Sequence, residues 1–110
     1  MYNNGLNFRD FTYVDDVIKI LKKSIQKKLS GEIINICRSN PIITNDLLKY
    51  VLKIYKNKKI LIEKTGFIKG EMLKTHGSNQ KLRNFFGKIN FTDIKKGLNE
   101  TINTYKKLSI

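Results

Sequence analysis

Hydrophobic and polar positions change period near residue 14. Across residues 8–14 bulky and polar side chains alternate, as in a short strand. The next apolar positions have helical spacing and predict a helix that ends at Ser30 and Gly31. These positions are Val14, Val17, Ile18 and Leu21. Asp15 and Asp16 fall in the first turn of this helix, where acidic side chains favour the helix dipole.

Residues 32–37 are a β-branched run of strand length, and Ile42–Ile43 can add a minimal strand. Thr44 or Asn45 can cap a second helix, whose apolar face extends to Ile54 and Tyr55. After a turn at Asn57 and Lys58, residues 59–64 are a further strand candidate. Residues 65–77 contain three glycines and no clean period, which predicts a loop of the length often used for binding.

Two helices are predicted after this loop. Ser78 can cap a short helix that Gly87 closes, and Thr92 with Asp93 can cap the last helix. The order strand, helix, strand, helix, strand, loop, helix, helix predicts the α/β class. No repeat or flexible linker interrupts the chain, so we expect one domain over residues 1–110.

The net charge of +13, with a pI near 9.9, favours an anionic partner such as nucleic acid. Nearly all the basic residues are lysines, however, and the only arginines are Arg9, Arg38 and Arg83. Nucleic-acid contacts favour the bidentate fork of arginine. Because A- and T-rich codons supply lysine, isoleucine and asparagine, compositional bias explains much of the charge. A small basic nucleic-acid-binding module therefore stays as an alternative only.

One cysteine, Cys37, and one histidine, His76, provide neither an internal disulfide nor a structural zinc site, so no metal is expected. Cys37 lies in the predicted strand at residues 32–37 and is expected to be buried. No apolar run is long enough to cross a bilayer, and no secretory signal is recognisable. We therefore expect a cytoplasmic protein without a membrane partner.

The most specific motif is the octet at residues 9–16, Arg-Asp-Phe-Thr-Tyr-Val-Asp-Asp, which follows Tyr-Asn-Asn-Gly at residues 2–5. The octet resembles the segment that opens the substrate-binding part of extended short-chain dehydrogenase/reductases, the NAD-dependent epimerase/dehydratase family. Within that family it is most similar to UDP-glucuronate epimerases. Segments at residues 31–52, 70–75 and 86–105 extend the resemblance over most of the chain.

This resemblance implies an α/β fold: the small C-terminal substrate-binding part of an extended Rossmann-type epimerase, with the N-terminal Rossmann domain missing. The family uses NAD, but this chain has no glycine-rich nucleotide fingerprint, so we expect neither a cofactor nor catalytic residues in it. Tyr55 and Lys59 have the Tyr-x-x-x-Lys spacing of the catalytic pair. They lie outside the family's alignment, and chance produces such a match in a lysine-rich chain.

The resemblance also implies three substrate-binding residues. Arg9 corresponds to the arginine that binds the nucleotide-sugar diphosphate, a role that suits its planar, permanently charged guanidinium. Tyr2 matches the aromatic side chain along the base. Glu71 matches an aspartate that bonds the ribose hydroxyls. Ile68 departs from the family pattern, because relatives often carry a long polar side chain at that position. The alternative for Arg9 is an ordinary surface arginine, or an arginine paired with Asp10.

The sequence leaves two main hypotheses for the function of the chain. The leading one is the substrate-binding portion of a UDP-sugar epimerase or dehydratase, with a UDP-glucuronate-like substrate and no activity alone. The other is a non-enzymatic remnant, or a split-protein piece that acts only with a missing Rossmann half. Saturable binding of UDP-sugars that depends on Arg9 would favour the first. Strong, salt-sensitive binding to any nucleic acid would favour the basic module instead.

Overall fold

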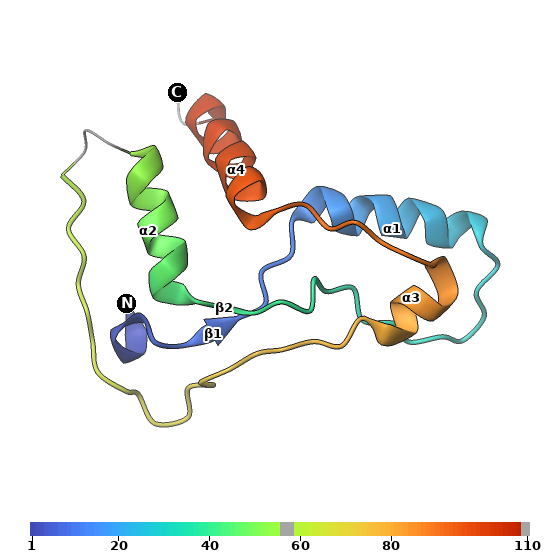
Figure 1. Cartoon of the computed structure of the whole chain (residues 1–110), viewed down its shortest axis with the longest axis horizontal. Helices are drawn as coiled ribbons and strands as arrows, with labels where there is room; N and C mark the ends of the chain where they lie inside the picture. The colour runs from blue at the N-terminus through green and yellow to red at the C-terminus, as the bar shows by residue number, and fades with distance from the viewer. Residues whose placement is uncertain (56–58, 109–110) are drawn as a thin grey trace. The chain divides into compact units, whose positions relative to one another are not determined.

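The computed structural model of the protein describes residues 1–55 and 59–108. The chain forms two compact units, each built from two separate segments (Figure 1). The first unit comprises residues 1–10 and 40–76, and the second unit comprises residues 11–39 and 77–110. In both units, residues far apart in the sequence therefore come together.

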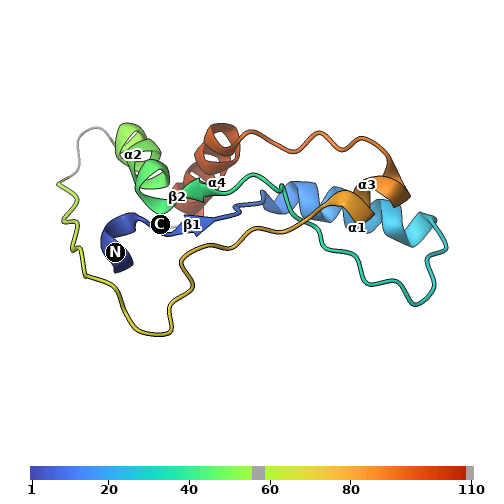
Figure 2. The same ribbon diagram turned by 60° about the horizontal axis from the view of Figure 1, so that its bottom comes forward.

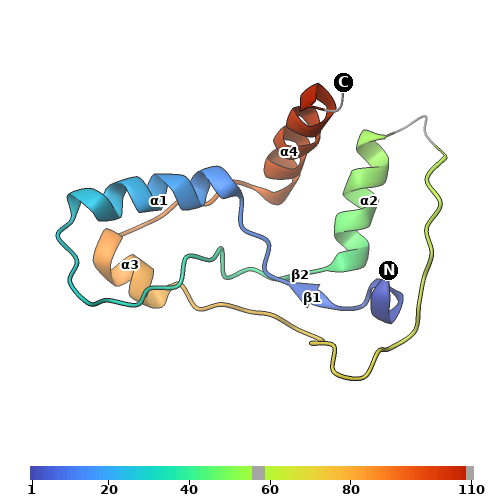
Figure 3. The ribbon, with the colours of Figure 1, turned by 180° about the vertical axis from the view of Figure 1, so that it is seen from behind.

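The first unit is organised around Phe8. Its elements are the 3₁₀ turn η1 (Tyr2–Gly5), the strands β1 (Phe8–Arg9) and β2 (Ile42–Ile43), and the helix α2 (Thr44–Ile54). The two strands pair antiparallel, with Phe8 opposite Ile43, and β2 leads straight into α2 (Figure 3). Phe8 also bridges in parallel to the loop, since its N–H donates to Leu73 O at 2.8 Å and its carbonyl accepts from Thr75 N at 3.1 Å. The loop is thereby fixed beside β1.

The N-terminal turn explains why the sequence has Asn-Asn-Gly. Asn3 and Asn4 have φ values of 45° and 51°, and Gly5 has φ 77°, in the left-handed region that asparagine and glycine tolerate best. A Cβ on Gly5 would also lie 2.6 Å from Met1 Cε. Asn4 N donates to Thr65 O at 2.9 Å, so this turn holds the beginning of the loop.

The second unit contains three helices, and each has one buried large apolar side chain. The helices are α1 (Val14–Gln26), α3 (Gln80–Phe86) and α4 (Ile94–Leu108). Helices α1 and α3 lie side by side (Figure 2). Ile20 of α1, Leu82 of α3 and Ile102 of α4 are the buried large apolar side chains of the described residues. Ile20 and Leu82 line the same cavity between α1 and α3.

Asp16 connects α1 to the segment that precedes α4. Its side chain is buried, and its two carboxylate oxygens accept from Thr92 N at 2.6 Å and from Thr92 Oγ1 at 2.8 Å. Asp93 then caps α4, because its Oδ1 accepts from Lys95 N at 2.9 Å. The last acidic residue of the octet thus has a structural partner 76 positions away in the sequence.

The predicted helices and the glycine-rich loop are present, but α1 ends at Gln26, before the predicted end at Ser30 and Gly31, and Asn79, not Ser78, is at the cap position of α3. The strand predictions hold only in part. The predicted strand at residues 8–14 is limited to Phe8–Arg9, and Ile42–Ile43 does form a strand. The strand predictions for residues 32–37 and 59–64 are wrong within the described chain, because neither segment has a ladder partner. Periodicity identifies which side chains share a face, but a strand also requires a neighbour. The expected turn at Asn57 and Lys58 lies outside the described residues.

Two local expectations are corrected as well. Cys37 is only half-buried and is not in a strand. Neither Thr44 nor Asn45 caps α2: the residue at the cap position is Ile43, without a side-chain cap bond. Thr44 Oγ1 instead donates to Asn7 O at 2.9 Å, and this contact fixes the start of the helix against β1. No helix within residues 1–55 and 59–108 is long and apolar enough to cross a bilayer.

Candidate functional site: a polar cluster around Arg9 and Glu71

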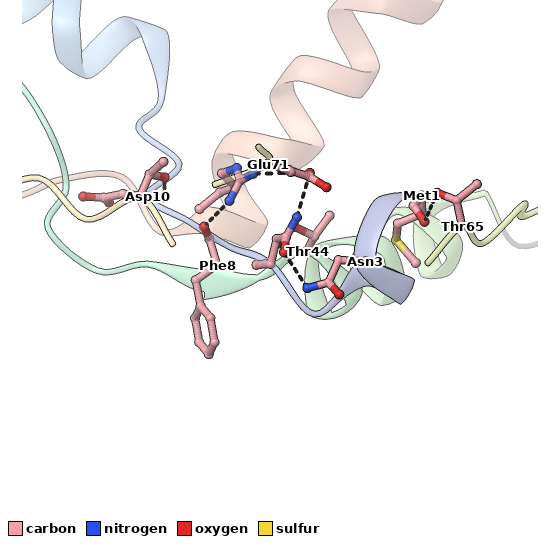
Figure 4. Close-up of polar contacts among 10 residues, drawn as sticks. Met1, Asn3, Phe8, Asp10, Thr44, Thr65 and Glu71 are labelled. Atoms are coloured by element: carbon pink, nitrogen blue, oxygen red, sulfur yellow. Dashed lines mark hydrogen bonds and ion pairs between the residues drawn. The ribbon is translucent and has the colours of Figure 1, made fainter. Parts of the chain in front are cut away.

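Arg9 is held at the end of β1 by contacts on two sides of its guanidinium. Its Nη1 donates to Phe8 O at 2.8 Å, and its Nη2 lies 3.6 Å from Glu71 Oε1 (Figure 4). The side chain is 28% exposed, so the guanidinium is oriented by the protein and still reaches solvent. A guanidinium has five N–H donors, so these two contacts leave donors for a ligand.

Glu71 reaches Arg9 because the loop turns sharply before it. Gly70 has φ 90°, and Glu71 N donates to Ile68 O at 3.1 Å across the turn. The carboxylate is fixed from the other side by Asn7, whose Nδ2 donates to Glu71 Oε1 at 2.7 Å. Asn3 Nδ2 in turn donates to Asn7 Oδ1 at 2.8 Å. The turn η1, strand β1 and the loop therefore contribute to one polar relay.

The second carboxylate oxygen of Glu71 has no partner. Glu71 Oε2 is buried and accepts no hydrogen bond, whereas Oε1 accepts from Asn7 and faces Arg9. A buried acceptor without a donor is unusual, because its lost hydration costs about 1–3 kcal/mol. A hydroxyl or amide of a bound molecule could supply the missing donor.

Two of the three predicted site residues meet, and the third does not. Arg9 and Glu71 are partners, but no hydrogen bond or ring contact in the described chain links Tyr2 to them. The Tyr2 side chain is 58% exposed on η1. Ile68 is also exposed, as is Lys69 beside it.

Asn3 and Asn7 are site residues that the sequence reasoning missed. Asn7 precedes Arg9 by two positions, and side chains two apart on a strand point to the same face. That spacing could have placed Asn7 beside Arg9. The burial of Asn7, which is 4% exposed, follows from three-dimensional packing and has no signal in the sequence.

Neither strand-to-helix junction fits NAD. A dinucleotide cradle needs a glycine-rich turn between a strand and a helix N-terminus. Here residues 10–13, which join β1 to α1, include no glycine, and β2 passes directly into α2 at Thr44. Within the described chain no cluster of histidine, cysteine or acidic residues could hold a metal ion either.

Comparisons with known proteins agree with the resemblance read from the octet. Residues 1–37 match the family model described as "NAD dependent epimerase/dehydratase family". An uncharacterized protein of Methanocaldococcus jannaschii is 30% identical over 96% of this chain and 32% of its own length. The UDP-glucuronate 4-epimerase of Thermodesulfobacterium geofontis is 31% identical over 97% of this chain and 33% of its own.

A solved structure supports the α/β fold class. The UDP-glucuronic acid 4-epimerase of Bacillus cereus, in complex with UDP-glucuronic acid and NAD, superposes with a TM-score of 0.85 at 24% identity. The match covers 98% of this chain and 35% of that one. The chain therefore spans about a third of the length of the relatives it matches.

Proposed function

Because residues 1–37 match the NAD-dependent epimerase/dehydratase family model and two relatives are 30–31% identical over 96–97% of this chain, we propose that the chain belongs to this family and that its first unit binds the nucleotide part of a UDP-sugar. A UDP-glucuronate-like sugar is the candidate substrate, since UDP-glucuronate 4-epimerases are among its relatives. The chain would be the substrate-binding part of such an enzyme, inactive alone.

The observation that carries this proposal is the oriented guanidinium of Arg9. Its 3.6 Å distance from Glu71 is longer than a charge-assisted hydrogen bond, so the pair is a loose one. A diphosphate could approach the free N–H groups without displacing a tight ion pair. The Phe8 carbonyl contact keeps the planar group in place while it binds, which limits the entropy lost on binding.

Glu71 and Tyr2 would complete the nucleotide site. The unpartnered Oε2 of Glu71 is suited to accept from a ribose hydroxyl, while Asn7 holds the other oxygen. Tyr2 presents an exposed ring on the turn next to Asn3, where a base could stack on it. These roles are the ones the family resemblance assigns to Glu71 and Tyr2.

The chemistry itself would come from elsewhere. Epimerisation requires NAD to take and return a hydride, together with a base that removes a hydroxyl proton. The residues described here fit neither task, so we propose that a Rossmann half carrying NAD is the functional partner. This chain would orient the UDP-sugar for that half.

The test is a calorimetric titration of the 110-residue chain with UDP-glucuronate. We expect saturable binding that Arg9→Ala weakens roughly 10- to 100-fold, since a charge-assisted hydrogen bond contributes about 1.5–3 kcal/mol. Arg83→Ala, which removes an exposed arginine of α3, is the matched control and should bind as the wild type does.

Two results would overturn this function. One is an absence of saturable binding by a chain whose circular dichroism shows it to be folded, which would favour the remnant. The other is an equal loss in both arginine variants with steep salt dependence, which is the behaviour of a nonspecific basic surface. Glu71→Gln should lower affinity less than Arg9→Ala, because the amide oxygen still accepts a hydrogen bond.

A further inference from the structure

The guanidinium of Arg38, in the second unit, has a buried nitrogen without a hydrogen-bond acceptor. No acceptor in the described chain lies within hydrogen-bond distance of its Nη1. Arg38 is half-buried overall, so part of the residue reaches solvent while Nη1 does not. Buried donors are nearly always paired. An unpaired nitrogen on a permanently charged group therefore needs a specific explanation.

The main chain of Arg38 is fixed on both sides by neutral side chains. Its N–H donates to Thr12 Oγ1 at 3.0 Å, and its carbonyl accepts from Asn79 Nδ2 at 3.2 Å. Asn79 is only 6% exposed and also donates to Cys37 O at 3.1 Å. The Arg38 side chain thus extends from a fixed backbone, which lowers the entropy lost when it binds a ligand.

The residue after Arg38 has an unusual backbone conformation. Ser39 has φ 60°, in the left-handed region that residues with a Cβ seldom adopt. Such conformations cost free energy, persist where surrounding contacts impose them and are concentrated at ligand sites. The contacts of Thr12 and Asn79 to Arg38 lie immediately before this residue. Strain beside an unpaired charge favours a binding role for Arg38.

The second unit gives Arg38 no counter-ion. Its sequence has thirteen lysines and arginines against five aspartates and glutamates. Three of these acids have other partners: Asp16 accepts from Thr92, Glu32 pairs with Lys81, and Asp93 accepts from Lys95 N. Among the described residues, no ion pair involves Arg38. A half-buried charge without a counter-ion is costly, so the missing partner is an anion from outside the chain.

We propose that Arg38 is a binding site for a carboxylate group. A guanidinium presents parallel N–H groups that match the two oxygens of a carboxylate. Binding gives Nη1 the acceptor it lacks and compensates the charge. The site goes beyond the proposed nucleotide site, because Arg38 belongs to the second unit, whereas Arg9, Tyr2 and Glu71 belong to the first.

Charge favours a carboxylate over a phosphate as the ligand group. The side chains that fix Arg38, Thr12 and Asn79, are neutral, so the guanidinium balances one negative charge. A phosphate monoester carries nearly two negative charges at neutral pH and would stay partly uncompensated. The carboxylate has two possible sources, the sugar of a UDP-uronate or a separate small acid, and the experiment distinguishes them.

The test titrates the 110-residue chain with UDP-glucuronate, with UDP-glucose, which lacks the carboxylate, and with glucuronate alone. If a UDP-uronate is the source, UDP-glucuronate should bind roughly 10-fold more tightly than UDP-glucose, and Arg38→Ala should abolish this difference without weakening UDP-glucose. If a separate acid is the source, glucuronate alone should bind, and Arg38→Ala should weaken it roughly 10-fold. In both cases the NMR signals of the Arg38 guanidinium should shift on binding.

A purely structural role for Arg38 makes the opposite prediction about stability. Arg38→Met keeps a long apolar stem and removes the charge, so the urea midpoint of the ligand-free chain should stay the same or rise. A lower midpoint would mean that the charge is already satisfied within the chain, and would overturn the proposal. Arg83→Ala, which removes an exposed arginine of α3 in the same unit, is the control and should change neither the midpoint nor carboxylate binding.

Two further outcomes would overturn the carboxylate site. One is that folded Arg38→Ala, checked by circular dichroism, binds all three ligands as the unchanged chain does. The other is that inorganic phosphate shifts the Arg38 signals as strongly as glucuronate does. The nucleotide site fails separately, because UDP-glucose binding tests it without a carboxylate. Glucuronate binding that depends on Arg38, in a chain that does not bind UDP-glucose, would reject the nucleotide site alone.

Discussion

The interactions that stabilise the first unit internally differ from those that stabilise the second unit. Large apolar side chains are buried only in the second unit among the described residues, at Ile20, Leu82 and Ile102. In the described part of the first unit the buried residues are Gly5 and Asn7. The first unit instead relies on backbone bonds around Phe8 and on the relay through Asn7 to Glu71.

This difference is informative about function. Burial of apolar side chains stabilises a unit without any ligand, at roughly 25 cal/mol per Å². A polar relay with an unpartnered acceptor is less stable until a donor completes it. Binding sites are generally drawn from such regions, where local stability is low and few apolar side chains are buried. The contrast therefore agrees with a nucleotide site in the first unit.

The largest expected effect comes from removing the core of the second unit. Leu82 is fully buried between the helices, so Leu82→Ala leaves a cavity as well as losing transfer free energy. We expect the free energy of unfolding to fall by about 2–5 kcal/mol, measured by urea denaturation. Amide exchange in α1 and α3 should rise most.

Leu108→Ala is the control for this variant, because Leu108 lies in α4 and is 79% exposed. Its effect should stay within roughly 0.5 kcal/mol, as is usual for surface substitutions. Equal effects of the two substitutions would show that the second unit has no apolar core in solution.

The sequence predicted the helices well because their apolar residues repeat within a single segment. The spacing of Val14, Val17 and Leu21 needs no distant partner to make a helix, and Gly87 ends α3 with a positive φ of 73° that glycine adopts readily. Strands were predicted poorly, since residues 32–37 have the pattern of a strand but no neighbour in the described chain.

The candidate site was predictable to the extent that a residue type implies a role. Arg9 stood out because arginine is scarce, and the family resemblance added Glu71. The relay through Asn7 was not predictable, because Asn7 and Glu71 are 64 positions apart and meet only through a turn of the loop. The family resemblance also gave Tyr2 its role, but the Tyr2 side chain is 58% exposed, and no hydrogen bond in the described chain links it to the cluster.

A smaller effect is expected from breaking the relay in the first unit. Asn7→Ala removes the donor to Glu71 Oε1 and the acceptor of Asn3, and leaves buried polar groups unsatisfied. We expect a loss of about 1–3 kcal/mol, together with faster exchange of the Phe8 and Thr75 amides. Asn35→Ala removes an exposed asparagine and should change neither quantity. If the two variants behaved alike, the relay would not hold the loop.

The smallest expected effect is the loss of stability of each unit at alkaline pH. Desolvation, followed by the nearby Asp15 carboxylate, raises the pKa of Tyr13 above its usual 10.0 in the second unit. The hydrogen bond to Asp46 raises the pKa of Lys49 above its usual 10.5 in the first unit. A raised folded-state pKa means that the stabilisation is complete below the unfolded-state value and is lost as pH rises through the folded-state value.

Both units should therefore lose a little stability above about pH 10, the usual pKa of tyrosine. Tyr13→Phe should remove the part of this loss that belongs to the second unit, and Lys49→Met the part that belongs to the first. Urea denaturation at pH 8 to 11 measures the slope of stability against pH in each variant. If one variant kept the pH dependence of stability of the unchanged chain, ionisation of the replaced residue would not be coupled to folding. The two units would then differ in their electrostatics as well as in their cores.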